Sequence, residues 1–224
     1  MKVGISQSNY IPWRGYFDLI KRCYLFIILD DVQYTTRDWR NRNKIKIHSG
    51  TQWLTIPVGR ISRDKRICDV ILPDVSWQQD HWNKIREAYK NTKYFNIYRV
   101  FFEELYFGYN YHTLSCLNRS FIDCICRLLG ITTIIKDSRD YSAKGYKKER
   151  ILNILKEVGG TKYYSGPAAK DYITDDDFKD NGIDVHWMNY NYPNYPQIHG
   201  PFEPYVSVID LIFNTGDDAP KYLI

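Results

Sequence analysis

Arginine and asparagine side chains are concentrated in the segment 37–44, which reads RDWRNRNK. A guanidinium group binds phosphate or carboxylate through two parallel hydrogen bonds, and an indole ring stacks on a base or a sugar. A charged run is more often a solvated surface loop, but the interleaved tryptophan and asparagines favour anion binding. We therefore expect a phosphate clamp made by Arg37, Trp39, Arg40, Asn41, Arg42 and Asn43.

Two adjacent carboxylates, Asp30 and Asp31, directly follow the apolar run 25–29. A carboxylate at the end of a strand can bind a ribose hydroxyl or Mg²⁺, or act as a general base. Adjacent side chains on a strand point to opposite faces. Only one of the two is therefore expected in a site, and we favour Asp31, with Tyr34 as a nearby substrate-binding residue. The structural alternative is a turn that ends the strand.

The loop 7–16, QSNYIPWRGY, lies between an expected strand and an expected helix. The first N–H groups of a helix attract anions, and glycine permits close backbone approach. The loop matches neither G-x-G-x-x-G nor the Walker sequence, and it only loosely resembles the phosphate loop of adenylyl-transferring Rossmann folds. A helix entry with a hydrophobic staple is the structural alternative. The binding residues expected here are Gln7, Tyr10, Trp13, Gly15 and Tyr16.

Two further positions could take part in chemistry. Ser165 and Gly166 precede Pro167, a residue that favours the first position of a helix, so the serine could cap that helix or contact a phosphate. His81 lies in a segment that also contains two tryptophans. Histidine titrates near neutral pH, so His81 joins Asp31 as a candidate general base, although a lone histidine is more often structural.

The hydrophobic pattern predicts the elements that position these residues. The continuous apolar runs 2–6, 25–29 and 132–136 are typical of strands buried on both faces, and residues 15–23 have helical spacing. We therefore expect an α/β, Rossmann-like fold with a mostly parallel sheet, flanking helices and ligands at the carboxyl ends of the strands. The chain is expected to form a single α/β domain, 1–224, with a helical insertion at about 77–130.

Other segments complete this prediction. A hairpin is expected between 44–47 and 52–58 because Ser49-Gly50 suits a turn. Further strands are expected at 67–72, 162–165 and 183–188. Further helices are expected at 147–158, 166–173 and 207–213.

Composition narrows the classes of function. The 31 basic and 26 acidic residues give a net charge of only +5, which argues against duplex nucleic acid as a partner. No apolar run approaches the ~20 residues of a membrane span, and the start of the chain reads as a strand rather than a signal peptide. We expect a cytoplasmic protein. Five cysteines without CxxC or HExxH predict neither a disulfide framework nor a metal site.

Several motifs together resemble one family. They are QSNYIPWRGYFDLI, LDDVQYTTRDWRNRNKIK, WLTIPV, HWNKIREAYKNTKYF, YYSGPAAKDYI and VSVIDLIFNTG. They look like the WbqC-like family of bacterial polysaccharide gene clusters, in which the opening motif usually reads Q-P-x-Y, with Pro where this chain has Ser8. The resemblance implies a role in the biosynthesis of O-antigen lipopolysaccharide or a similar surface glycan. It also implies chemistry on a nucleotide-linked amino sugar.

From the residues and the resemblance together, we expect a transferase that forms an amide on the sugar amine by acyl or aminoacyl transfer. The donor would be an acyl thioester or an adenylate made from ATP. A nucleotidyltransferase remains an alternative within enzymes. A non-catalytic protein that binds a nucleotide sugar, or assists assembly, is the alternative outside enzymes.

Overall fold

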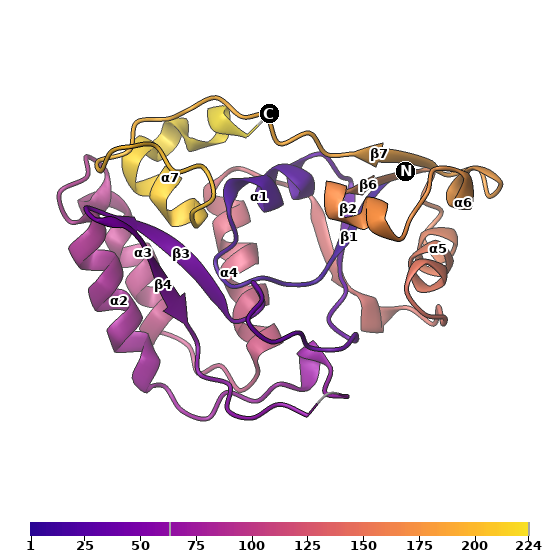
Figure 1. Ribbon diagram of the computed structural model, residues 1–224, viewed down its shortest axis with the longest axis horizontal. Helices are drawn as coiled ribbons and strands as arrows, with labels where there is room; N and C mark the ends of the chain where they lie inside the picture. The colour runs from indigo at the N-terminus through magenta and orange to yellow at the C-terminus, as the bar shows by residue number, and fades with distance from the viewer. Residues whose placement is uncertain (63, 224) are drawn as a thin grey trace.

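A parallel β-sheet organises the protein. The computed structural model describes residues 1–62 and 64–223, and within them one sheet has five strands in the order β5-β2-β1-β6-β7 (Figure 1). Every neighbouring pair in this sheet is parallel. The strands are β1 (Lys2–Ser6), β2 (Leu25–Ile28), β5 (Ile134–Asp137), β6 (Lys162–Ser165) and β7 (Asp184–Trp187). The predicted runs 2–6, 25–29 and 132–136 are thus confirmed as three neighbouring strands.

The strand order reverses at β1. The chain adds β2 and then β5 on one side of β1, and β6 and then β7 on the other side. This is the doubly wound arrangement of Rossmann-like folds, in which ligands bind beyond the carboxyl ends of the strands. The predicted α/β fold class is therefore confirmed.

Helices cover both faces of the sheet (Figure 1). Successive side chains of β2 point to opposite faces of the sheet, with Phe26 and Ile28 on one face and Leu25 and Ile27 on the other. Because both faces are apolar, both must be covered. The first face is covered by α1 (Arg14–Lys21), α4 (Leu114–Leu128) and α7 (Val208–Thr215). The second face is covered by α5 (Lys148–Glu157) and α6 (Asp176–Lys179).

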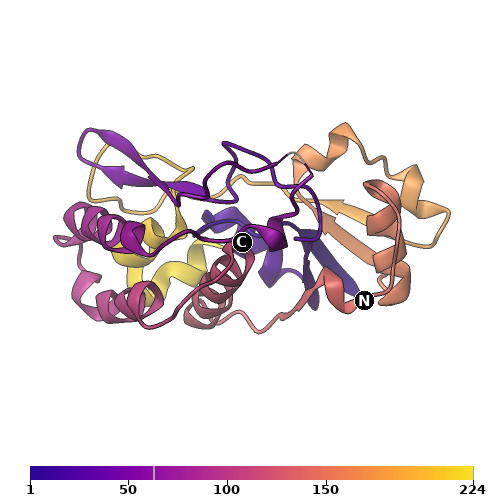
Figure 2. The ribbon, with the colours of Figure 1, turned by 90° about the horizontal axis from the view of Figure 1, so that it is seen from below.

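A long insertion separates β2 from β5. It contains the antiparallel hairpin β3 (Arg42–Ile47) and β4 (Gly50–Thr55), and then the helices α2 (Ser76–Tyr89), α3 (Phe95–Phe107) and α4. Figure 2 shows these helices at one end of an elongated molecule and α5, β6 and α6 at the other end. Helices therefore occupy the region expected at 77–130, while the assignment of the whole chain to one domain stays a prediction.

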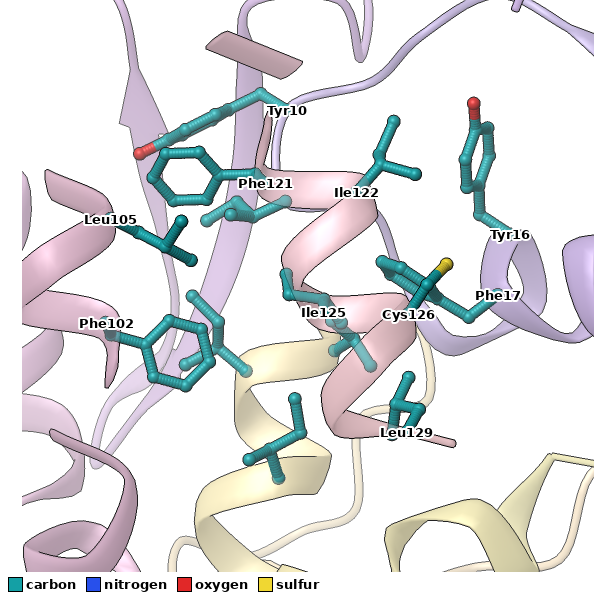
Figure 3. Close-up of a cluster of buried hydrophobic side chains, with 14 of the residues drawn as sticks. Tyr10, Tyr16, Phe17, Phe102, Leu105, Phe121, Ile122, Ile125, Cys126 and Leu129 are labelled. Carbon is teal, nitrogen blue, oxygen red and sulfur yellow. The ribbon is translucent and has the colours of Figure 1, made fainter. Parts of the chain in front are cut away.

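The amphipathic pattern of α4 explains how the insertion joins the sheet. Thr113 caps the helix by accepting a hydrogen bond from the backbone N–H of Cys116 at 3.2 Å. Phe121, Ile122 and Ile125 are fully buried on the helix. Figure 3 shows this face of α4 between side chains of α3 and of α1. Burial of each such side chain contributes about 1.5–3 kcal/mol, which fixes the insertion against the sheet.

Two sequence-based assignments were wrong. The segment 67–72 was expected to be a strand but begins as a single 3-10 turn, Ile67–Asp69. Its N–H groups donate to carbonyls of the loop after β2, from Ile67 to Val32 and from Cys68 to Asp30, so no strand partner is needed. The expected helix 166–173 is a shorter 3-10 helix, Pro167–Asp171. No helix within residues 1–62 and 64–223 combines the length and apolar character needed to cross a membrane.

Candidate functional site

A cavity of about 910 Å³ lies at the carboxyl ends of the sheet strands. Its wall includes Gln7 after β1, residues 29 and 31–33 after β2, the loop 141–147, the first turns of α5, and Tyr172, which follows β6. The volume is near the upper end of the ~300–1,000 Å³ found for small-molecule sites. The position agrees with the rule for doubly wound sheets.

The side chains of Asp31 and Arg150 form an ion pair on the wall of this cavity. The Arg150 guanidinium Nη2 lies 2.8 Å from Asp31 Oδ2, and the Ser138 hydroxyl donates to Asp31 Oδ1 at 2.6 Å. Both charged side chains are largely buried, yet both line the cavity. Asp31 is thus held in a fixed orientation by Ser138, which directly follows β5, and by Arg150 in the first turn of α5.

Asp30 points the opposite way, as the alternation of a strand requires. It is fully buried and accepts hydrogen bonds from the Ser8 N–H at 2.8 Å, from the Ser8 hydroxyl at 2.7 Å and from the Ser115 hydroxyl. Desolvation raises the pKa of Asp30, and these hydrogen bonds oppose that rise. Asp30 therefore fastens the loop after β1 to the end of β2.

The loop 141–147 supplies cationic side chains beside the start of α5. Lys144 and Lys147 are exposed on the cavity wall. Gly145 and Lys147 have positive φ angles of 118° and 50°, which curl the chain just before the helix. No side chain caps the first N–H groups of α5. The two lysines and the uncapped N-terminus of α5, a helix of ten residues, form an environment that favours an anion.

Hydrogen bonds hold this loop along α5. The Glu157 carboxylate accepts from the N–H groups of Ser142 at 2.9 Å and Ala143 at 2.7 Å. The Asn153 amide donates to the Lys144 carbonyl at 2.8 Å. The cationic wall is therefore fastened to the same helix that carries Arg150.

Most of this wall was not expected from the sequence. The unexpected residues include Tyr141, Lys144, Gly145, Tyr146, Lys147, Arg150 and Tyr172. A signal was present, because the residues KGYKK at 144–148 place glycine among lysines directly before a predicted helix. Only Gln7 and Asp31 of the predicted site residues line this cavity.

The segment 37–44 does not line the large cavity, so the phosphate clamp expected there stays a prediction that is separate from this cavity. The Arg40 guanidinium donates to the Ser8 carbonyl at 3.2 Å and to Asn9 Oδ1, and it lies 3.6 Å from Asp38. The Asn41 amide donates to the Ile56 carbonyl at 2.8 Å. These side chains serve the chain's own acceptors and join the loop after β1 to the hairpin.

Two of the remaining predicted residues of this segment line a second, smaller cavity, and two do not. Trp39 and Asn43 line a space of about 250 Å³ together with Trp13. The Arg42 guanidinium lies over the Trp53 ring at 4.2 Å from its centroid and also donates to the carbonyl of exposed Arg37. Two predicted site residues thus line the large cavity, three line the smaller one, and the others line neither.

His81 is a core residue and lines neither cavity. Its Nε2–H donates to the Thr55 carbonyl at 3.2 Å, so its Nδ1 accepts from the Tyr10 hydroxyl at 2.9 Å. Burial lowers the pKa of His81 to about 4. Asp31 and His81 are therefore not brought together, and neutral His81 fills a structural role in this arrangement.

Other predicted residues support the two cavities from outside. The buried Tyr16 hydroxyl donates to the Gln7 carbonyl at 3.0 Å. Tyr34 is buried, and its N–H donates to the Lys65 carbonyl at 2.8 Å. Ser165 is also buried, and Gly166 lies close to the Tyr190 hydroxyl.

Comparisons with known proteins identify the family. The sequence profile of the WbqC-like protein family matches residues 7–222. A protein of Mycobacterium tuberculosis (strain ATCC 25618 / H37Rv), named Uncharacterized protein Rv1507c, is 43% identical over 224 residues, which is 99% of this chain and 97% of that protein.

The chain belongs to the WbqC-like protein family. No solved structure matches it. Ser8 stands where the WbqC-like motif usually has proline, and its N–H and hydroxyl both bind Asp30. In this chain the loop after β1 is therefore fixed by hydrogen bonds from Ser8 to the buried Asp30 carboxylate, where a proline would restrict the backbone instead.

Proposed function

We propose that this WbqC-like protein binds a nucleotide-linked amino sugar in the 910 Å³ cavity and forms an amide on the sugar amine. The observation that carries the proposal is the arrangement of one cavity wall, where the Asp31–Arg150 pair adjoins Lys144 and Lys147. Cations on one side of a carboxylate suit a substrate that carries both phosphates and an amine.

The charges of the cavity suggest how such a substrate binds. The diphosphate occupies the cationic end, where Lys144, Lys147 and the start of α5 neutralise it. Tyr141 and Tyr146 offer aromatic rings for the base. The sugar then reaches Asp31, beyond the end of β2.

Amide formation requires an unprotonated amine. In the proposed reaction the Asp31 carboxylate accepts a proton from the substrate ammonium. The amine nitrogen then attacks the acyl carbon, and the bond from that carbon to the thioester sulfur or to the adenylate oxygen breaks. The leaving thiolate or AMP takes the bonding electrons, and the nitrogen loses its second proton to the leaving group or to water. The role of this carboxylate is supported by its fixed orientation and its place on the cavity wall.

The test is an incubation of the protein with UDP- or dTDP-linked amino sugars, ATP, and candidate amino acids or acyl-coenzyme A donors, followed by mass spectrometry. A product heavier by one acyl group through a new amide is expected. Pyrophosphate release without an amide would favour nucleotidyl transfer instead. Nucleotide-sugar affinity by calorimetry without turnover across the donor panel would favour a non-catalytic binding protein.

A further inference from the structure

We infer that the second cavity is a binding site for a neutral pyranose ring of a saccharide, separate from the nucleotide-sugar cavity. Its wall consists of three aromatic rings, two asparagines and one proline, namely Trp13, Trp39, Tyr205, Asn9, Asn43 and Pro12. The inference rests on this wall and does not require the proposed amide-forming reaction.

The chemistry of the wall matches one kind of ligand. A pyranose presents C–H groups on its faces and hydroxyl groups around its edge. Aromatic rings remove such C–H faces from water, while the Asn9 amide group and the Tyr205 hydroxyl can hydrogen-bond the edge. No charged side chain lines this cavity within the described residues, so a charged ligand has no partner in the wall. The volume of about 250 Å³ suits a single ring rather than a whole nucleotide.

The indole of Trp13 is fixed in place before any ligand binds. A Cβ atom at Gly15 would stand only 2.3 Å from the Trp13 ring, so the indole packs where only glycine leaves room. The opposite contacts of this indole are with Tyr190, at 4.9 Å between ring centroids, and with Tyr205, at 5.5 Å. A ring held in this way loses little freedom on binding.

The loop that forms the wall is strained. Ile11 is a buried β-branched residue with a φ of 34°, a backbone region that such residues rarely adopt. The buried Asn43 amide stabilises it by donating to the carbonyls of Tyr10 at 3.1 Å and Ile11 at 2.8 Å. Strain of this kind concentrates at ligand sites, and here it lies between Asn9 and Trp13.

Two aromatic residues of the cavity wall are exposed to solvent. Trp39 is 40% exposed and Tyr205 is 60% exposed. The backbone of Trp39 is nevertheless fixed, because its N–H donates to Asp38 at 2.7 Å and its carbonyl accepts from Tyr10 at 3.0 Å. An exposed ring on a fixed backbone beside a cavity is an arrangement that suits a stacking ligand.

Three segments distant in the sequence build this site. The Val208 N–H donates to the Pro12 carbonyl at 2.9 Å, and the Ser207 N–H donates to the Lys44 carbonyl at 2.8 Å. The loop after β1, the strand β3 and the segment before α7 are therefore bound together around the cavity. The loop after β1 also reaches the nucleotide-sugar cavity through Gln7.

The test uses saturation-transfer-difference NMR with methyl glycosides of glucose, galactose and N-acetylglucosamine. Transfer from the protein to the C–H face of at least one glycoside is expected. Trp39→Ala removes an exposed ring and should weaken that binding about tenfold. Gly15→Ala keeps every aromatic residue but displaces Trp13, and it should weaken binding to a similar extent.

Two controls separate this site from the nucleotide-sugar cavity. Tyr24→Ala removes an exposed aromatic ring outside the wall and should alter affinity less than twofold. Saturating UDP should not displace the glycoside. The inference is overturned if no glycoside receives saturation, if Trp39→Ala binds as the wild type does, if only phosphorylated sugars bind, or if UDP competes. Failure of amide formation in the preceding assay leaves these outcomes unaffected.

Discussion

Asp31 and Arg150, 119 residues apart in the chain, form an ion pair of 2.8 Å between the end of β2 and the first turn of α5. The pair links the sheet to the helix on its second face and places both charges on the wall of one cavity. In this position Asp31 is held by the protein rather than by a substrate.

Asp31→Asn tests the proposed role of this carboxylate. The amide keeps the shape but cannot accept the proton, so turnover should fall by about 10²–10⁴-fold while nucleotide-sugar affinity changes little. Steady-state kinetics and calorimetry measure the two effects. Asp177→Asn is the matched control. Asp177 also pairs with a cation of α5, Lys148, at 2.8 Å, but neither of these two residues lines the cavity. Equal turnover in both variants would remove Asp31 from the mechanism.

Lys144→Ala should weaken UDP binding about tenfold, since it removes a charge-assisted contact to phosphate. The loss should shrink at high salt because an exposed charge is screened. Lys148→Ala is its control, as that lysine is committed to Asp177 and does not line the cavity. Calorimetry at two ionic strengths provides the measurement. Similar losses for both lysines would indicate a diffuse charge effect instead of a phosphate site.

Arg40→Ala should lower the free energy of unfolding by about 1–3 kcal/mol, because the acceptor groups of Ser8, Asn9 and Asp38 lose their guanidinium partner. Urea denaturation measures this change. Exposed Arg37 is the control, and its replacement by alanine should change stability by less than about 0.5 kcal/mol. If Arg40→Ala instead keeps full stability and loses nucleotide affinity, the arginine acts on the ligand after all.

The buried histidine predicts a pH dependence of stability. Burial lowers the pKa of His81 from 6.5 to about 4 in the folded protein, so between these values the unfolded chain binds a proton that the folded protein excludes. The free energy of unfolding should therefore fall as pH decreases from about 6.5 to about 4, by up to about 3 kcal/mol from this group.

Buried carboxylates also titrate in acid, so the measured quantity is the difference between variants. His81→Gln should reduce the loss of stability over that pH window relative to the wild type. His112→Gln, at an exposed histidine, should leave the loss unchanged. Parallel curves for wild type and His81→Gln would contradict the assigned burial effect.

The sequence determined the sheet and indicated one residue of the large cavity's wall, Asp31. Short apolar runs can satisfy their backbone groups and bury both faces only as strands of a covered parallel sheet, and this is local information. The same alternation separated Asp31 from Asp30 correctly, because neighbouring strand residues must point to opposite faces. The motifs of the chain also indicated its family correctly.

Only the tertiary structure decided which charged side chains line the large cavity. The motif 37–44 has the composition of an anion clamp, yet Arg40 and Asn41 donate to the Ser8 and Ile56 carbonyls, which lie in distant segments of the chain. Arg40 also lies 3.6 Å from the carboxylate of Asp38 in its own loop. Lys144 and Lys147 lie just before and at the start of the helix expected at 147–158, yet the crossover from β5 to β6 places them in the cavity beyond the end of β2. Composition records the hydrogen-bonding capacity of a side chain. The fold decides whether the protein or a ligand satisfies that capacity, because its partners are set by contacts between distant segments.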